Sequence, residues 1–235
     1  MHVSKTKKPL VLSVLFFLPV IFLLFLYPSK HNYKTLDIVQ TNIPELHDFK
    51  TLEGDSIQLE GHLSVVGFLG NNPMEDATFA LNLKELIYDK FLGFKRFQVL
   101  ALVPHSAKQQ VLDLNKELSA FAPLKYWKFV FGTEQAIKEA YTNFKIMRPL
   151  SFNLSSNHVF VVDRERHQRG RLDDRIKSEI ESNAAVYPMT SYDVMEISDL
   201  KNKMSDDIRI LFTEYRQKRK GNFSSTTRRA NDLKQ

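Results

Sequence analysis

The sequence predicts an α/β sandwich with a mixed β-sheet, preceded by one N-terminal transmembrane helix. Short apolar runs typical of buried strands recur along the chain, and segments with apolar residues at helical spacing lie between them. A hairpin-like segment near the end closes the pattern, which favours a sheet with both parallel and antiparallel strands. An uncharged apolar segment near the start predicts the membrane helix.

The membrane helix is predicted over residues 9–27, after a short basic stretch over residues 1–8. At about 1.5 Å per residue, this uncharged segment reaches roughly the 30 Å of a bilayer's hydrocarbon core. A cleavable signal peptide would have a shorter apolar core of about 7–15 residues and small residues at its exit. The exit here runs from Phe25 to Lys30 and offers no such cleavage site. The helix is therefore expected to stay as a single-pass anchor.

The distribution of lysines predicts the orientation of this anchor. Lys5, Lys7 and Lys8 precede the segment, whereas Lys30 and Lys34 follow it. Because positive residues are retained inside, the N-terminus is expected in the cytoplasm and the C-terminal domain in the periplasm or another extracytoplasmic space. That compartment permits disulfides, but the chain contains no cysteine and uses none.

The basic residues concentrate at the C-terminal end. The formal net charge is +6, and the surplus lies from Arg216 onward, in a segment rich in Ser, Thr and Asn. Residues 217–235 are therefore predicted to form a disordered basic tail, with a solubilising role favoured over a lipid or partner contact. The rest of the chain is electrically balanced, so a nucleic-acid groove is not expected.

The folded domain is expected over residues 43–216, after a linker over residues 28–42. Residues 46–59 alternate weakly around Gly54, which predicts a β-hairpin. The run over residues 63–69 is almost continuously apolar and predicts a strand buried on both faces.

A helix start follows this strand. Asn72 is predicted as its N-cap, Pro73 as its first residue, and Glu75 as the third residue that completes a capping box.

The remaining elements alternate between helices and strands. Strands are predicted at residues 97–103 (ended by Pro104), 127–131 and 159–162, and a turn at 163–166 leads into a return segment over 167–172. A polar stretch over residues 174–192 then precedes the last helix. Four helical stripes are predicted, at Phe79, Leu83, Leu86 and Ile87 (closed by Gly93), at Val111, Leu114, Leu118 and Ala122, at Ile137, Ala140, Tyr141 and Phe144, and at Ile197, Leu200, Met204, Ile208, Leu211 and Tyr215.

Five segments, taken in chain order, carry a resemblance to a known family. They are Ile43-Pro44, Leu52-Glu53-Gly54-Asp55, the strand at residues 65–69, Trp127 to Thr133, and Val159 to Asp163 followed by Arg169-Gly170. Together they resemble the Sco/SenC family, membrane-anchored thioredoxin-like proteins of cytochrome c oxidase copper assembly. The resemblance covers about residues 43–215 and implies a thioredoxin-like three-layer sandwich.

The family's ligand positions hold other residues in this chain. The resemblance implies a Cys-x-x-x-Cys pair after the first buried strand and a His eight residues before the Asp that ends the late strand. These positions correspond to Asn72, Asp76 and Ser155. Thiolates and an imidazole suit copper, but a carboxylate, an amide and a hydroxyl do not. Without cysteine, dithiol exchange is chemically excluded, so the resemblance implies a degenerate site with no catalytic residue and no cofactor.

The sequence favours a non-catalytic domain that binds an unidentified envelope or membrane protein, in assembly of a respiratory or other membrane complex. The alternative is a copper-binding protein in which Met74, Asp76 and His158 replace the family ligands. A lone histidine beside an apolar strand is more often structural. An enzyme of unrelated chemistry has no supporting motif, because neither a nucleophile elbow nor a phosphate-binding glycine loop is present.

Overall fold

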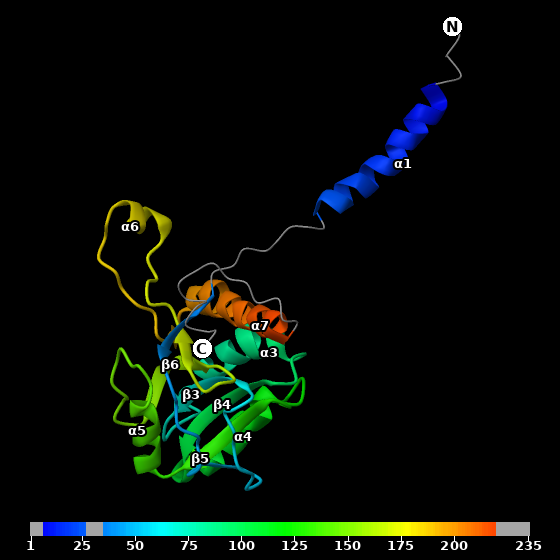
Figure 1. The fold of residues 1–235 in the computed structure, drawn as a ribbon. Coiled ribbons are helices and arrows are strands. Elements are labelled where there is room, and N and C mark those ends of the chain that lie inside the picture. The colour runs from blue at the N-terminus through cyan, green and yellow to red at the C-terminus, as the bar shows by residue number, and fades with distance from the viewer. Residues whose placement is uncertain (1–6, 27–34, 220–235) are drawn as a thin grey trace. The chain divides into compact units, whose positions relative to one another are not determined.

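The computed structural model describes residues 7–26 and 35–219, and the chain divides into two units at Thr35 (Figure 1). The described part of the first unit is one helix, α1 (Lys7–Leu26), which contains Pro19. Its large apolar side chains from Val11 to Phe25 are exposed. Among the residues described, no helix has the length and apolarity needed to cross a membrane. Tyr27, the end of the predicted span, and residues 220–235 of the predicted tail lie outside the described residues.

The second unit is built on one mixed sheet of eight strands. Its three central strands run parallel to one another, and the strands on either side run antiparallel to their neighbours. In sheet order the strands are β1 (Asp37–Gln40), β7 (Gln168–Gly170), β6 (Ser155–Val162), β3 (Leu63–Leu69), β4 (Phe97–Pro104), β5 (Trp127–Gly132) and β2 (Lys50–Thr51), and β8 (Tyr192–Asp193) pairs with β6 outside this path.

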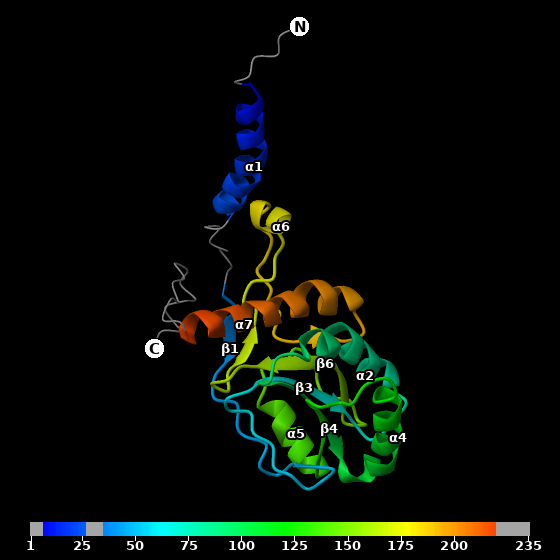
Figure 2. The same cartoon turned by 90° about the vertical axis from the view of Figure 1, so that its right-hand side faces the viewer.

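Helices cover both faces of the sheet and give three layers (Figure 2). One helix covers one face of the sheet, and four helices cover the other face. The helices are α2 (Ala77–Leu83), α3 (Asp89–Phe91), α4 (Lys108–Leu118), α5 (Glu134–Thr142), α6 (Lys177–Glu181) and α7 (Ser205–Arg219), with π-helical turns at Lys84–Tyr88 and Asp199–Met204 and a 3-10 turn at His105–Ala107. Helix α5 covers one face alone, whereas α2, α3, α4 and α7 cover the other.

This arrangement confirms the predicted thioredoxin-like α/β sandwich with a mixed sheet. Every residue of β3 and β4 is buried, because both strands lie in the middle of the sheet with helices above and below. Their register pairs Val65 with Val99 and Gly67 with Ala101. The nearly continuous apolar runs of the sequence therefore predicted the central strands correctly.

The N-terminal edge of the domain differs from the prediction. The expected linker over residues 28–42 contains strand β1, in which Asp37 pairs with Gly170 of β7. This strand has only four residues and a distant partner, so it leaves no local signal. The expected hairpin over residues 46–59 is reduced to a turn at Gly54 (φ 91°) and one bridge between Lys50 and Ser56, because β2 pairs with β5 instead.

The predicted helical stripes are confirmed at most of their positions, and the helix ends differ. Phe79, Leu83 and Ile87 are buried as predicted, but the helix ends at Phe91, and Gly93 does not adopt a left-handed conformation. Helix α4 ends at Leu118, four residues before Ala122, and α5 ends at Thr142, although Phe144 beyond it is buried. In the last stripe, Ile197 is exposed and Tyr215 is partly buried, whereas the other four members are buried as predicted: Leu200, Met204, Ile208 and Leu211.

A buried ion network joins the sheet to α7. The guanidinium of Arg169 on β7 donates to Asp163 and to Glu214 of α7, each at 2.9 Å, and to the carbonyl of Leu36 at 2.7 Å. All three charged side chains are buried. Burial alone would lower the pKa of Arg169, but the two carboxylates outweigh it and raise the pKa above its ordinary value. The network therefore holds β1, β7 and α7 together through one side chain.

Removing Arg169 is expected to destabilise the fold strongly. In Arg169→Met, Asp163 stays buried without its cation and Glu214 keeps only its pair with Lys218, so we expect a loss of about 3–5 kcal/mol in the free energy of unfolding. Urea denaturation of the full chain, followed by circular dichroism, measures this loss. The matched control is Arg209→Met, which removes an exposed pair with Asp206 and is expected to change the free energy by less than about 1 kcal/mol. Equal effects of the two substitutions would contradict the structural role of Arg169.

Candidate functional site

The candidate site lies where β3 ends, at the position that holds thiol chemistry in the family that the sequence resembles. Gly70 has a φ of 67°, and a Cβ on it would lie 2.4 Å from the carbonyl oxygen of Asn153. The amide of Asn71 donates to the same carbonyl at 2.8 Å. Only glycine permits so close an approach in this conformation. The end of β3 is thus fixed against the loop that leads into Ser155.

The segment after Gly70 forms turns before the helix begins. Helix α2 begins at Ala77, and its N-cap, Asp76, makes no side-chain capping bond. The predicted capping box at Asn72 and Glu75 is therefore wrong. The side-chain nitrogen Nδ2 of Asn72 donates to the carboxylate of Glu75 at 3.3 Å, and its side-chain oxygen Oδ1 accepts from Gln110 of α4 at 3.4 Å. Because the Asn72 side chain is bonded to Gln110 on α4, it does not cap α2.

The structure brings two of the three degenerate positions together. The side chain of Asp76 lies close enough to the side chain of Ser155, at the start of β6, to affect the pKa of the carboxyl. The hydroxyl of Ser155 also donates to Oδ1 of Asn153 at 2.8 Å, and the same oxygen accepts from the Ser155 amide at 3.1 Å. Asn72, the third position, is bonded to Glu75 and Gln110 instead. The degenerate site is thus a polar contact between α2 and β6.

Burial raises the pKa of Asp76, and the charge of Glu75 raises it further, whereas the hydrogen bond from Ser155 opposes the shift. Among the described residues, no hydrogen-bond partner reaches Oδ2 of Asp76. The pair can hold a proton, but the serine hydroxyl is already committed to Asn153, and neither group is paired with an imidazole base. It lacks the arrangement that activates a nucleophile.

His158 lies on β6 and pairs with Asp193 of β8. Its Nδ1 lies 3.2 Å from the hydroxyl of Ser191. Its Nε2 lies 3.9 Å from a carboxylate oxygen of Asp193 on β8. The histidine is a partnered structural residue between β6 and β8.

The residues of the alternative ligand set have different neighbours. Met74 is partly buried against the core that contains α2, and His158 contacts Ser191 next to β8. Within residues 7–26 and 35–219, no three His, Asp or Glu side chains form a group that could hold a metal ion. Copper binding through Met74, Asp76 and His158 stays a prediction from the sequence.

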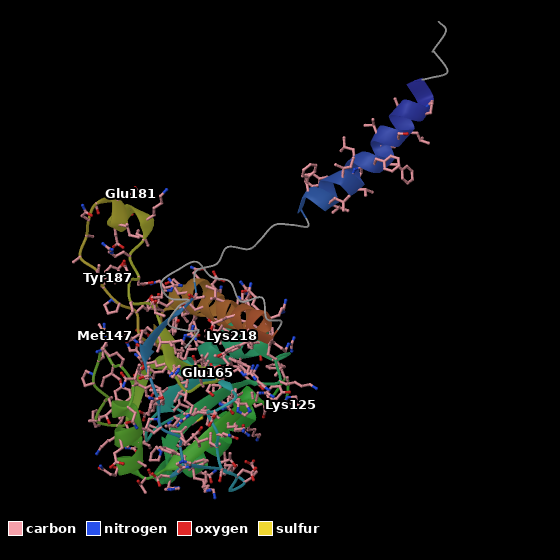
Figure 3. All side chains as sticks on the ribbon, in the orientation of Figure 1. Lys125, Met147, Glu165, Glu181, Tyr187 and Lys218 are labelled. Carbon is pink, nitrogen blue, oxygen red and sulfur yellow. The ribbon has the colours of Figure 1, made fainter. Side chains whose placement is uncertain are left out.

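An exposed arm lies between β7 and β8 at residues 172–187, and we call it the α6 arm. The sequence predicted only a polar stretch over residues 174–192 here. The arm projects away from the sheet in both views, and Tyr187 and Glu181 lie along it (Figures 1, 2 and 3). Its two sides are bonded to each other. The amide of Asp174 donates to the carbonyl of Tyr187 at 2.9 Å, and Arg175 donates to the carbonyl of Ala184 at 2.7 Å. Five apolar side chains of the arm are exposed, those of Leu172, Ile176, Ile180, Val186 and Tyr187.

The base of the α6 arm is fixed to the last helices. Arg171 donates to Asp174 at 2.8 Å and to both carboxylate oxygens of Asp207 on α7. Lys203 donates to the other oxygen of Asp174 at 2.7 Å, and Tyr192 donates to Asp207 at 2.8 Å. The polar character of residues 174–192 hid this arm, although Ile176 and Ile180 lie one helical turn apart and signal a short apolar face.

Comparison with known proteins gives only distant structural likenesses. BsSco, a member of the Sco family of cytochrome c oxidase assembly proteins, is 14% identical over 75% of this chain and 96% of that one, with a TM-score of 0.49. The soluble domain of Sco1 from Bacillus subtilis is 12% identical over 78% and 95%, with a TM-score of 0.43. ScoI from Arabidopsis thaliana, with copper bound, is 13% identical over 68% and 94%, with a TM-score of 0.41.

No protein-family model and no curated protein matches this chain. At these identities and TM-scores, the solved structures support no inference about its activity, ligands or partners.

The environment of His158 predicts a pH dependence of stability. Burial lowers its pKa below the ordinary value of 6.5, and the charge of Asp193 opposes the shift only in part. Because the unfolded chain then binds a proton more tightly, the stability contributed by neutral His158 is present above pH 6.5 and is lost as the pH falls below it.

Melting temperatures of the full chain at about pH 7.5 and about pH 5 test this dependence. The parent protein is expected to lose more stability on acidification than His158→Gln does. The control is His47→Gln at an exposed histidine, which is expected to follow the parent. If the parent and His158→Gln lost the same amount in melting temperature between the two pH values, His158 would not contribute to the pH dependence.

Proposed function

We propose that this chain is a membrane-tethered, non-catalytic thioredoxin-like protein that docks a protein partner through the α6 arm. The observation that carries the proposal is that the arm is fixed at its base and bonded along its length, yet exposes five apolar side chains. Burying apolar surface is favourable, so an ordered segment that leaves such side chains in water marks an interaction site.

The charge of the arm favours a protein over a lipid surface. Residues 172–187 contain the carboxylates Asp173, Asp174, Glu179 and Glu181 but only two cations, Arg175 and Lys177. Anionic bilayers attract basic segments, so a net acidic arm is poorly suited to them. Apolar side chains surrounded by acidic ones suit a protein groove with a basic rim.

The degenerate site supports a role without thiol chemistry. The chain has no cysteine, and Asp76 and Ser155 lie near each other at the positions where the resemblance implies a thiol and an imidazole. The scaffold is retained while its reactive groups are replaced, as expected of a domain used for binding. The partner class, an envelope or membrane protein in assembly of a respiratory or other membrane complex, rests on the sequence resemblance to the Sco/SenC family.

The membrane tether is part of the same proposal. Its support is the uncharged apolar segment over residues 9–27 and the lysines before it, which favour a cytoplasmic N-terminus and an extracytoplasmic domain. The full chain should stay in the membrane fraction after washing with alkaline carbonate. Release into the wash would contradict the tether.

Replacing the apolar face of the arm is expected to abolish partner binding without unfolding the domain. In Ile176→Ser/Ile180→Ser, two exposed side chains lose their apolar surface. The amount of any specifically co-purifying protein should therefore fall by at least about tenfold. The measurement is affinity purification of the full chain from its own membranes in mild detergent, with quantitative mass spectrometry.

The matched control is Phe121→Ser/Phe152→Ser, which removes two side chains that are 97% and 99% exposed elsewhere on the domain. It is expected to leave co-purification unchanged. Thermal unfolding should be the same for all three proteins. If both double variants retained the same partners as the parent, the arm would not be the docking surface.

A further inference from the structure

A pocket of about 370 Å³ lies at the end of the sheet where β3 begins and the loop before β4 meets α7. It is separate from both the degenerate site and the α6 arm. Five of its lining residues are cations, and none is acidic. The cations are Lys95, Arg96, Arg164, Arg216 and Arg219.

Aromatic contacts fix the walls of this pocket. The rings of Phe94 and Phe212 are stacked, with centroids 3.9 Å apart and planes at 17°, and both lie in the lining. Phe212 also packs against buried Phe91, with centroids 5.8 Å apart, which anchors the stack to the core. The apolar wall is therefore an ordered part of the domain that faces a cationic rim.

Arg164 is oriented before any ligand arrives. Its guanidinium lies 5.1 Å from the ring centre of Tyr215, and its Nε donates to the carbonyl of Gly61 at 3.3 Å. Its backbone amide donates to the hydroxyl of Tyr215 at 3.1 Å. These contacts fix the side chain, and its two terminal nitrogens donate no hydrogen bond to the residues that the structure describes. A guanidinium held in this way is suited to a phosphate or carboxylate.

The charge of the pocket is not compensated within the part of the chain that the structure describes. There, none of the five cations forms an ion pair with a carboxylate. Other cations of the domain do: Arg169, Arg171 and Lys203 each contact at least one carboxylate. Like charges gathered in one pocket repel each other, and an anion relieves that repulsion.

We propose that this pocket binds an organic phosphate, that is, a phosphate group joined to an apolar or aromatic moiety. The arginines and Lys95 bind the phosphate oxygens, and the stacked Phe94 and Phe212 contact the apolar part. The same chemistry is found in a phospholipid headgroup and in a soluble phosphate ester. The site is independent of partner docking through the α6 arm.

Calorimetric titration of the full chain in neutral detergent with phenyl phosphate tests the proposal. We expect saturable binding that is tighter than that of inorganic phosphate, because the ring adds apolar contact. In Arg96→Gln/Arg216→Gln, affinity is expected to fall by at least about tenfold. The matched control, Lys108→Gln/Lys138→Gln, removes the same charge at two exposed lysines outside the pocket and is expected to bind as the parent does.

Competition with dihexanoyl phosphatidylglycerol identifies the source of the ligand. Displacement of phenyl phosphate by the lipid supports a headgroup, whereas binding of phenyl phosphate without displacement supports a soluble ester. Absence of saturable binding of both probes, or equal weakening in the two double variants, would overturn the proposal. Thermal unfolding of each variant shows whether a loss of binding reflects a loss of fold.

Discussion

The positions of the α6 arm and the basic pocket depend on the contacts that the buried guanidinium of Arg169 makes. It joins the carbonyl of Leu36 before β1, the carboxylate at the end of β6, and Glu214 on α7. A cation so deeply buried is tolerated only with both carboxylates in place, so the three elements have one stable arrangement. The α6 arm starts just after β7, and the basic pocket is lined by α7, so both depend on this junction.

A second ion network extends the junction toward the α6 arm. Arg171 lies two residues after Arg169 and reaches Asp207 on α7, and Asp174 accepts from both Arg171 and Lys203. The pKa of Asp207 is raised because burial outweighs its bonds to Arg171 and Tyr192. Burying these groups is costly unless their geometry is satisfied, and here each is bonded. The arm is therefore presented from a rigid base, which lowers the entropy cost of binding a partner.

The backbone at the end of β3 is fixed by a close approach. Gly70 permits β3 to approach the Asn153 carbonyl, two residues before Ser155. The side chains of Asp76 and Ser155 then lie near each other between the start of α2 and the start of β6. The frame and the chemistry are thus separable, which is why a fold of this kind does not by itself indicate an activity.

The sequence predicted the central strands well because burial on both faces leaves a continuous apolar run, as in β3 and β4. The sequence did not predict features that depend on a partner far away in the chain. Strand β1 depends on β7, and the side chain of Asn72 is taken by Gln110 of α4. Glu214 is fully buried on a helix whose other charges are mostly exposed, and no local pattern marks it.

The candidate site was predicted only in part. The resemblance marked Asp76 and Ser155 as positions of one site but predicted no contact between them. The partners of His158 lie at β8, a strand of two residues that carries no sequence signal. The α6 arm is one continuous segment, but its polar character gave no signal of an ordered arm, and the basic pocket gathers residues from separate segments that no single window of sequence contains.

Site-specific photo-crosslinking in native membranes tests the central claim most directly. A photoreactive residue at position 180, on the apolar face of the α6 arm, is compared with one at position 152, where Phe152 is 99% exposed against 47% for Ile180. We expect one discrete protein adduct from position 180 and none from position 152. Absence of an adduct at 180, or the same adducts from both positions, would contradict a partner-binding role for the arm.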